Sequence, residues 1–343
     1  MKDVKVASVA FRSEFGEPQT NCESMLACIA EAAAAGAAWV CFPEVALQGY
    51  HSDVDRMQRE AEPLDGAYLT RLRHAAAHHA VTLSVGLALR LPTEPPGDGR
   101  VLNSVLHIGP DGKLRGEPRC SGKVHAEKDM FAMPRPDESW PVVDLGFAKV
   151  GTVICFDAEF PEAGRSLALG GADVIFMSFA TGRCDSKGNQ ASAVGFDWAT
   201  DVLRWAPAIA YMNRCYCVAS NHAGDVADPQ GIASIESCRP PLLKGDVHTW
   251  PGFCFCLNPD GEIVAESPRG SHQQSILYCK LDGSAVNTFR AAKHWGNMLA
   301  HRRPETYGRL TLLHPTAAAA SATTTTTAGG IGGLAARRHT ARL

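Results

Sequence analysis

The stretch that decides the fold is "KVGTVICFDAEFPEAGRSLALGGADVIF", residues 149–176. An apolar run ends at Cys155, an acidic turn with a proline follows, and a helix-like segment leads into a second apolar run. This order of strand, helix and strand is typical of an α/β fold. A sharp turn there exposes a side chain and aims backbone N–H groups and the positive end of the helix at it. Cys155 is therefore either a nucleophile or a small apolar residue that ends a buried strand.

Alternating strand-like and helix-like segments extend outward from this stretch. We expect a helix that begins near Asn21 as N-cap and stops at Gly36, and a short strand "WVCFPE" that ends at Glu44. The segment 189–212 is helical in period, and "NPDG" at 258–261 is a strong hairpin signal. Helices that cover sheet faces are expected, and the hairpins argue against a purely parallel sheet.

Length and composition indicate one large domain followed by a tail. The chain has 343 residues, of which 45% are apolar, so it can bury a large core. No linker divides residues 1–314, whereas residues 315–343 collapse to low complexity, "TAAAASATTTTTAGGIGGLAARRHTARL". Such a segment buries too little apolar surface to offset its ordering entropy, so we expect it to be disordered.

Charge and cysteine use restrict the partners and the compartment. A net charge of −3 without a basic stripe argues against nucleic-acid and membrane-surface partners and favours a small-molecule substrate. The N-terminus carries no signal-peptide pattern, and no run of 18 apolar residues occurs, so we predict a cytoplasmic protein with reduced thiols. Pairs spaced i, i+2, such as Cys215 with Cys217 and Cys254 with Cys256, are expected as core residues and not as zinc ligands.

A nucleophilic thiol needs a proton acceptor, and none of the thirteen histidines is singled out by its segment. A carboxylate, Glu44 in "CFPEVALQGY", ends another strand, and Lys123 lies in "CSGKVHAEKDMF". A carboxylate screened from water acts as a general base if its pKa is raised, and a lysine can stabilise a tetrahedral oxyanion. The chain lacks H-E-x-x-H and any compact His/Asp cluster, which disfavours a metal-dependent hydrolase.

Together, Glu44, Lys123 and Cys155 resemble the catalytic residues of the nitrilase superfamily of carbon–nitrogen hydrolases. The motifs are "FPEVALQGY", "GKVHAEKDMF" and "GTVICFDAEFPEAGRSLALGGADVI", with further matches in "NSVLHIGPDGKL", "AIAYMNRCYCVASNHAGD", "PDGEIVAES" and "RRPETYG". The resemblance extends to about residue 313. It implies a four-layer α-β-β-α sandwich, a homodimer or higher homo-oligomer, and no metal or other cofactor.

The resemblance also implies a mechanism. Cys155 would attack the substrate carbon while Glu44 takes the thiol proton, and Lys123 with the backbone N–H of Phe156 would stabilise the tetrahedral intermediate. By the same pattern Glu127 would be a second catalytic glutamate. Its alternative is a surface carboxylate paired with Lys128, because the segment after the lysine looks shortened.

The substrate class is inferred from the residues around the nucleophile. Phe156 and Asp157 follow the cysteine where nitrilases in the narrow sense tend to have Trp-Glu, which favours an amide or N-carbamoyl substrate. Phe156, Phe179 and Ala180 would line the pocket. Glu159 would bind a substrate amino group, or instead be a turn residue or pair with Arg165. Nitrile hydrolysis, and a silent member kept for binding or assembly, remain the alternatives.

Overall fold

The computed structural model describes residues 1–51, 53–92, 99–116, 130–134, 140–181, 183–184, 198–227, 247–291 and 297–312. Its strands are β1 (Val4–Ala10), β2 (Trp39–Cys41), β3 (Glu62–Pro63), β4 (Thr82–Arg90), β5 (Val101–Ile108), β6 (Leu114–Arg115), β7 (Val142–Asp144), β8 (Lys149–Ile154), β9 (Val174–Ser178), β10 (Arg183–Cys184), β11 (Tyr216–Ser220), β12 (Ala223–Ala227), β13 (Val247–Pro251), β14 (Phe255–Leu257), β15 (Ile263–Glu266) and β16 (Ser275–Leu281). Its helices are α1 (Pro18–Ala34), α2 (Val54–Glu60), α3 (Ala67–His79), α4 (Pro161–Leu169), α5 (Trp198–Asn213) and α6 (Gly283–Ala291), with the 3₁₀ helices η2 (Cys155–Glu159), η3 (Pro304–Thr306) and η4 (Gly308–Thr311). Residues Met1–Leu299 form one compact unit, and a second unit begins at Ala300. The predicted tail, residues 315–343, lies outside the described residues.

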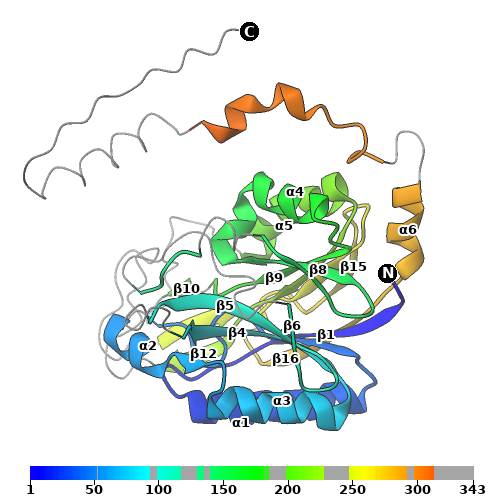
Figure 1. The fold of residues 1–343 in the computed structure, drawn as a ribbon. Coiled ribbons are helices and arrows are strands. Elements are labelled where there is room, and N and C mark those ends of the chain that lie inside the picture. Colours follow the sequence, from blue (N-terminus) through cyan, green and yellow to red (C-terminus); the bar gives the residue numbers. More distant parts are fainter. Residues whose placement is uncertain are drawn as a thin grey trace, which may run out of the picture. The chain divides into compact units, whose positions relative to one another are not determined.

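Two sheets stack face to face between two layers of helices. The first has the order β16-β1-β2-β4-β5-β6, with β3 beside β4, and the second has the order β15-β14-β11-β9-β8-β7. Central strands run parallel in both, whereas β16, β5, β14 and β7 join antiparallel. Figure 1 shows α1 and α3 over the first sheet and α4 and α5 over the second. The predicted α-β-β-α sandwich is confirmed.

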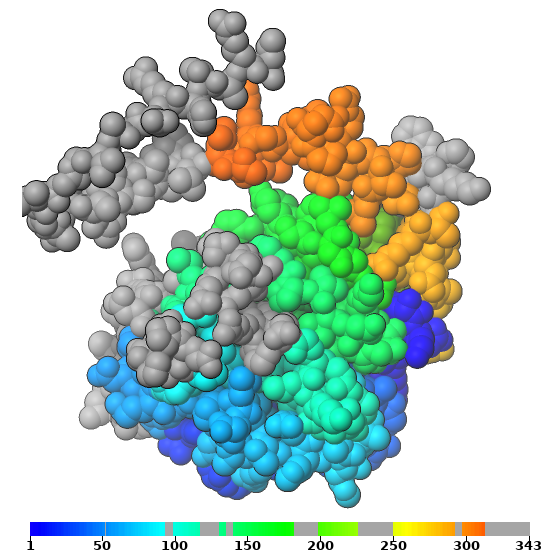
Figure 2. Space-filling view, in the orientation of Figure 1, coloured from blue at the N-terminus to red at the C-terminus, as the bar shows by residue number. Residues whose placement is uncertain are grey.

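Continuous apolar runs in the sequence form the central strands because both faces of each sheet are covered. On β9, Val174 and Phe176 face the layer between the sheets, whereas Ile175 and Met177 face α4 and α5. In the space-filling view the blue-to-cyan first part of the chain lies against the green residues that follow it (Figure 2). This close packing is what brings strand ends from the two sheets to one place.

The start of α1 differs from the prediction that Asn21 is its N-cap. The helix begins at Pro18. Proline suits the first position of a helix because a backbone N–H at that position would have no partner within the helix. Asn21 lies inside the helix, and its Nδ2 donates to the carbonyls of Glu14 (2.8 Å) and Leu47 (3.1 Å). The side chain therefore holds a neighbouring turn instead of capping its own helix.

Other local predictions are confirmed. The "NPDG" segment joins the antiparallel strands β14 and β15, and Asn258 Oδ1 accepts from the backbone N–H groups of Asp260 and Glu262, both at 3.0 Å. The thiols of Cys215, Cys217, Cys254 and Cys256 are buried, as expected for core residues. Of the segment 189–212, α5 covers the part from Trp198, and residues 189–197 lie outside the described part of the chain.

A buried polar chain joins the sheets through His107. Its Nδ1 lies 2.8 Å from Ser84 Oγ and its Nε2 lies 3.3 Å from Thr152 Oγ1 on the opposite sheet. Burial lowers the pKa of His107 from 6.5 to about 4, so the folded ring stays neutral at pH values where the unfolded chain takes up a proton.

This histidine makes stability depend on pH. Its contribution is fully present above pH 6.5 and is lost as the pH falls from 6.5 towards about 4. We expect His107→Gln to reduce the acid-induced loss of unfolding free energy between pH 7 and pH 4 by roughly 3 kcal/mol. Urea unfolding of both proteins at the two pH values measures this difference. Identical acid sensitivity of the two would contradict the assignment.

Candidate active site

Three strand ends meet at one edge of the sandwich. Glu44 follows β2, Cys155 follows β8, and residues 179–181 follow β9. The backbone N–H of Glu44 lies 3.4 Å from the carbonyl oxygen of Phe179, and the hydroxyl of Thr181 lies 3.9 Å from Cys155 Sγ. Residues 179–181 thus contact both the candidate base and the candidate nucleophile, which come from different sheets.

Cys155 lies at the sharp turn after β8 that the sequence predicts. It is the first residue of η2, and Pro161 then begins α4. Its φ of +50° lies in the left-handed region, which costs a residue with a side chain on the order of 1–3 kcal/mol. Such strain persists only where the surrounding structure fixes it, and it is concentrated at functional sites. The thiol is half-buried, in contrast to the fully buried core cysteines.

Glu44 is fully buried, and both its side-chain carboxylate and its backbone carbonyl accept hydrogen bonds. Asn103 Nδ2, from β5, donates to Glu44 Oε1 at 2.6 Å, and His222 Nε2 donates to the Glu44 carbonyl at 2.6 Å. The next residue, Val45, is also left-handed, with φ of +47°. A β-branched residue in this conformation is a genuine outlier. Both candidate catalytic residues therefore lie at strained strand-to-turn junctions.

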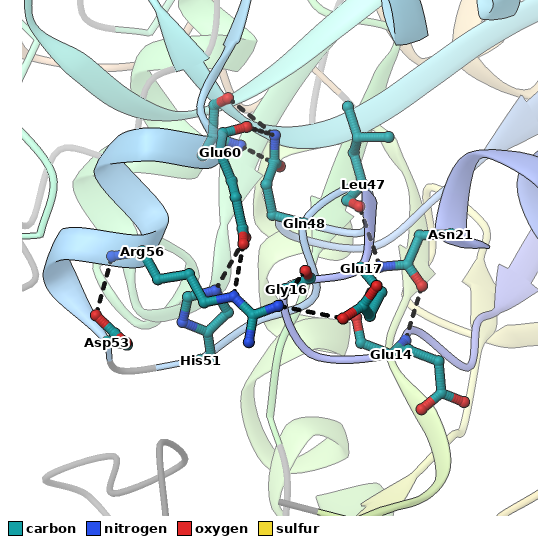
Figure 3. Close-up of polar contacts among 11 residues, drawn as sticks. Glu14, Gly16, Glu17, Asn21, Leu47, Gln48, His51, Asp53, Arg56 and Glu60 are labelled. Atoms are coloured by element: carbon teal, nitrogen blue, oxygen red, sulfur yellow. Dashed lines mark hydrogen bonds and ion pairs between the residues drawn. The ribbon is translucent and has the colours of Figure 1, made fainter. Parts of the chain in front are cut away.

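Further polar contacts hold the turn after Glu44, and Figure 3 shows those made by Leu47 and Gln48. Asn21 donates to the Leu47 carbonyl, and Gln48 donates to the carbonyl of Glu60 (3.1 Å) while accepting from the N–H of Ala88 (2.9 Å). The carboxylate of Glu60 is in turn bound by Arg56 Nε at 2.6 Å. The Asn21 side chain of α1 and the backbone of α2 and β4 thus hold the turn that carries the candidate base.

Gly86 on β4 provides a test of this tight packing. A Cβ at this position would lie 2.0 Å from the Pro43 carbonyl oxygen and 2.8 Å from Glu44 Cα. We expect Gly86→Ala to displace Glu44 and lower kcat/KM about 10²-fold, because misplacement by about 1 Å costs that much. Gly308→Ala is the control, since its Cβ would meet no atom within 4 Å. Steady-state kinetics measure the effect, and unchanged activity of Gly86→Ala would argue against a rigidly held base.

Tyr50, not predicted as a site residue, is buried in one apolar cluster with Val45, the residue after Glu44. Its side chain is buried, and burial raises its pKa well above the ordinary value, with smaller contributions from Glu44 and Cys155. The phenol therefore stays neutral. Ala180 belongs to the same small apolar cluster as Tyr50.

The other predicted site residues lie as follows. The ring of Phe179 packs edge-on against Trp198 at 4.7 Å in the core beneath α5, so its backbone is the part near Glu44. Phe156 is 47% exposed and contacts Phe160 edge-on at 5.0 Å. Glu159 is exposed, and partial burial of its carboxylate raises the pKa. Lys123 and Glu127 lie outside the described residues.

Sequence reasoning missed Asn103, Tyr50 and Thr181. The signal for Asn103 is a polar residue inside the apolar run "VLNSVLHI", where burial requires a hydrogen-bond partner. Tyr50 lies six residues after Glu44, and Thr181 lies three residues after the end of β9. Nothing in the sequence around either residue shows that folding brings it to the site.

Among the described side chains, no group of three His, Cys, Asp or Glu could hold a metal ion. Within the same ranges, no helix combines the length and the apolar character that crossing a membrane requires.

Comparison with known proteins defines the class. The family profile of carbon-nitrogen hydrolases matches residues 5–291, and the chain belongs to this family. N-carbamoylputrescine amidase of Solanum tuberosum is 30% identical over 215 residues, 62% of this chain and 64% of that protein. A nitrilase of Pyrococcus abyssi is 37% identical over 176 residues, 50% of this chain and 63% of that protein. The chain thus spans slightly less than two thirds of either relative.

Solved structures agree on the fold. A carbon-nitrogen hydrolase from Helicobacter pylori superposes with a TM-score of 0.69 at 19% identity, covering 91% of this chain and 99% of that one. An amidase from Nesterenkonia sp. AN1, whose active site cysteine carries the acetamide moiety of fluoroacetamide, gives a TM-score of 0.63 at 20% identity, covering 90% and 97%. The sandwich is therefore of the nitrilase type.

Proposed function

We propose that the protein is a thiol-dependent amidohydrolase that releases ammonia from a linear amide or an N-carbamoyl compound. The observation that carries this proposal is that residues 179–181 contact both the backbone of Glu44, whose side chain is buried, and the half-buried thiol of Cys155. A hydrolase that uses a covalent acyl intermediate needs a nucleophile and a base, and we assign these roles to Cys155 and Glu44.

The proposed reaction has two halves. The Cys155 sulfur bonds to the amide carbon as Glu44 takes the thiol proton, and the negative charge moves to the carbonyl oxygen. Lys123 and the N–H of Phe156 would stabilise that oxyanion. When the C–N bond breaks, the protonated Glu44 gives its proton to the departing ammonia. Water then attacks the thioester with Glu44 again as base, which releases the acid and restores the thiol.

The relatives support this choice of substrate but differ among themselves. Two of the relatives named above are an N-carbamoylputrescine amidase and a nitrilase. The Phe156-Asp157 sequence after the nucleophile favours the amide and N-carbamoyl classes. Nitrile hydrolysis is the second candidate, supported by the 37% identity to the Pyrococcus abyssi nitrilase. Glu159, an acidic residue of the turn that follows Cys155, is proposed to bind a substrate amino group.

Ammonia release from a panel of substrates tests the proposal. The panel contains ω-amino amides, dicarboxylic acid monoamides, N-carbamoyl amino acids and simple nitriles. Turnover of an amide or N-carbamoyl class is the expected result, and turnover of nitriles alone would replace the proposal with the second candidate. Glu159→Gln should reduce the preference for amino-bearing over neutral amides, and an unchanged preference would remove Glu159 from the pocket.

We also propose that the chain forms a homo-oligomer in the cytoplasm. Leu169 at the end of α4 and Tyr211 and Met212 near the end of α5 are about half exposed, at 51%, 47% and 51%. Apolar side chains gathered on one pair of helices favour self-association. Light scattering after size exclusion would measure the mass, and a strictly monomeric protein would contradict this part of the proposal.

A further inference from the structure

The carboxyl end of β11 lies at the same edge of the second sheet as the candidate nucleophile. β11 runs parallel to β9, and β9 runs parallel to β8, so these three strands end together. Just beyond β11 the backbone crosses to the first sheet: the N–H of Phe11 donates to the Asn221 carbonyl (3.1 Å), and the N–H of Ala223 donates to the Phe11 carbonyl (2.9 Å). Asn221 and His222 thus join the two sheets beside the site.

Asn221 holds the segment that faces the nucleophile. The N–H of Thr181 donates to Asn221 Oδ1, and Asn221 Nδ2 donates to the carbonyls of Thr181 and Gly252, all at 3.0 Å. These bonds need an acceptor and two donors on one planar group, as a carboxamide provides. Aspartate has the same shape but no donor, so it would leave both carbonyls unpaired. The Thr181 hydroxyl held in this way lies 3.9 Å from Cys155 Sγ.

His222 supports the backbone of Glu44. A carbonyl oxygen can only accept, so Nε2, 2.6 Å from the Glu44 carbonyl, carries the proton. Nδ1 then accepts from the hydroxyl of Ser13 at 2.9 Å, and the ring packs against Trp250 with centroids 4.9 Å apart. Burial lowers the pKa of His222 to about 4, so at neutral pH the ring bonds the base without adding a charge beside it.

We propose that Asn221 and His222 are positioning residues that together set the separation between the Glu44 carboxylate and the Cys155 thiol. The inference rests on the proposed function, in which that carboxylate takes the thiol proton. Proton transfer needs heavy atoms within about 2.6–3.2 Å, and misplacement by about 1 Å costs about 10²-fold in rate. Glu44 and Cys155 follow strands of different sheets, so their separation depends on the residues that tie the sheets together at this edge.

The experiment compares four variants, three at the proposed positions and one at Ser13, with two matched controls. His222→Leu removes the donor, His222→Gln keeps one, Asn221→Asp removes the amide donors, and Ser13→Ala removes the hydroxyl that bonds Nδ1 of His222. The controls are His107→Leu, a buried neutral histidine also bonded to a serine, and Asn213→Asp, a buried asparagine whose Nδ2 donates to the Ile209 carbonyl at 2.9 Å.

Each protein is measured for kcat and KM on a substrate that the wild type turns over, for its thermal midpoint, and for the rate at which iodoacetamide alkylates Cys155. Peptide mass mapping separates Cys155 from the other cysteines. We expect His222→Leu and Asn221→Asp to lower kcat about 10²-fold with KM changed less than about threefold, and the alkylation rate to fall as well. His222→Gln should recover at least about tenfold in kcat, and the controls should lose stability but keep kcat.

Equal losses of kcat in the variants and their controls would overturn the proposal, as would a His222→Gln protein no more active than His222→Leu. If His222→Leu does not fold, Asn221→Asp and Ser13→Ala decide together, because the first removes the amide donors and the second frees the His222 ring from one of its two hydrogen bonds. Wild-type kcat and alkylation rate in both variants would overturn the proposal. If the wild type hydrolyses no amide, N-carbamoyl compound or nitrile, the proposed function fails on its own. The alkylation rates relative to the controls still decide whether the pair positions the thiol.

Discussion

Replacement of Cys155 by alanine is expected to abolish ammonia release while leaving the fold intact. Removing the nucleophile of a covalent hydrolase lowers kcat by up to about 10⁶-fold, so we expect a loss of at least about 10³-fold here. The thiol is half-buried at a turn, and alanine keeps the same backbone at φ of +50°, so little packing is lost. Ammonia assays and thermal unfolding, run side by side, measure the two effects.

Cys217→Ala is the matched control for this variant. Cys217 is fully buried in β11, and burial raises its pKa well above the ordinary value, so its thiol is inert. Its replacement should lower stability through a small cavity and leave kcat unchanged. If Cys155→Ala retained turnover close to that of Cys217→Ala, the nucleophile would have to be sought elsewhere.

Much of this fold could be predicted because its signals are local. The apolar run before Cys155, the proline at the start of α4 and the "NPDG" hairpin each depend on a few adjacent residues, and the structure has all three. The same locality explains the error at Asn21. An asparagine near a helix start satisfies the usual capping preference, but here its amide binds the Leu47 carbonyl, 26 residues away.

The surroundings of the site could not be predicted, because they depend on contacts between sheets. Asn103 reaches Glu44 from a strand 59 positions later, and His222 reaches the same residue from 178 positions later. The "SNHAGD" segment is distinguished only by the family resemblance, since nothing local in it indicates which backbone groups its side chains contact. Single-sequence patterns give the strand ends, whereas the stacking of the two sheets decides which ends meet.

Replacement of Glu44 by glutamine is expected to lower kcat/KM by about 10²–10⁴-fold, the usual contribution of a general base. Glutamine has the size of glutamate, and its side-chain oxygen can still accept from Asn103 Nδ2. The loss should therefore be chemical. Glu62→Gln is the control: Glu62 is also buried, and its Oε1 accepts from the N–H groups of Tyr68 (2.8 Å) and Leu69 (3.0 Å), away from the site.

Because the proposed reaction has two halves, Glu44→Gln is also expected to change which intermediate accumulates. Glu44 serves acylation and deacylation, but a thiol ionises more readily than water, so glutamine should slow the attack of water more than the attack of Cys155. We then expect a thioester to accumulate on Cys155 in Glu44→Gln, visible as an added acyl mass on the intact protein that hydroxylamine removes. Full activity of Glu44→Gln, or an acyl mass on a cysteine other than Cys155, would contradict the assignment of this pair.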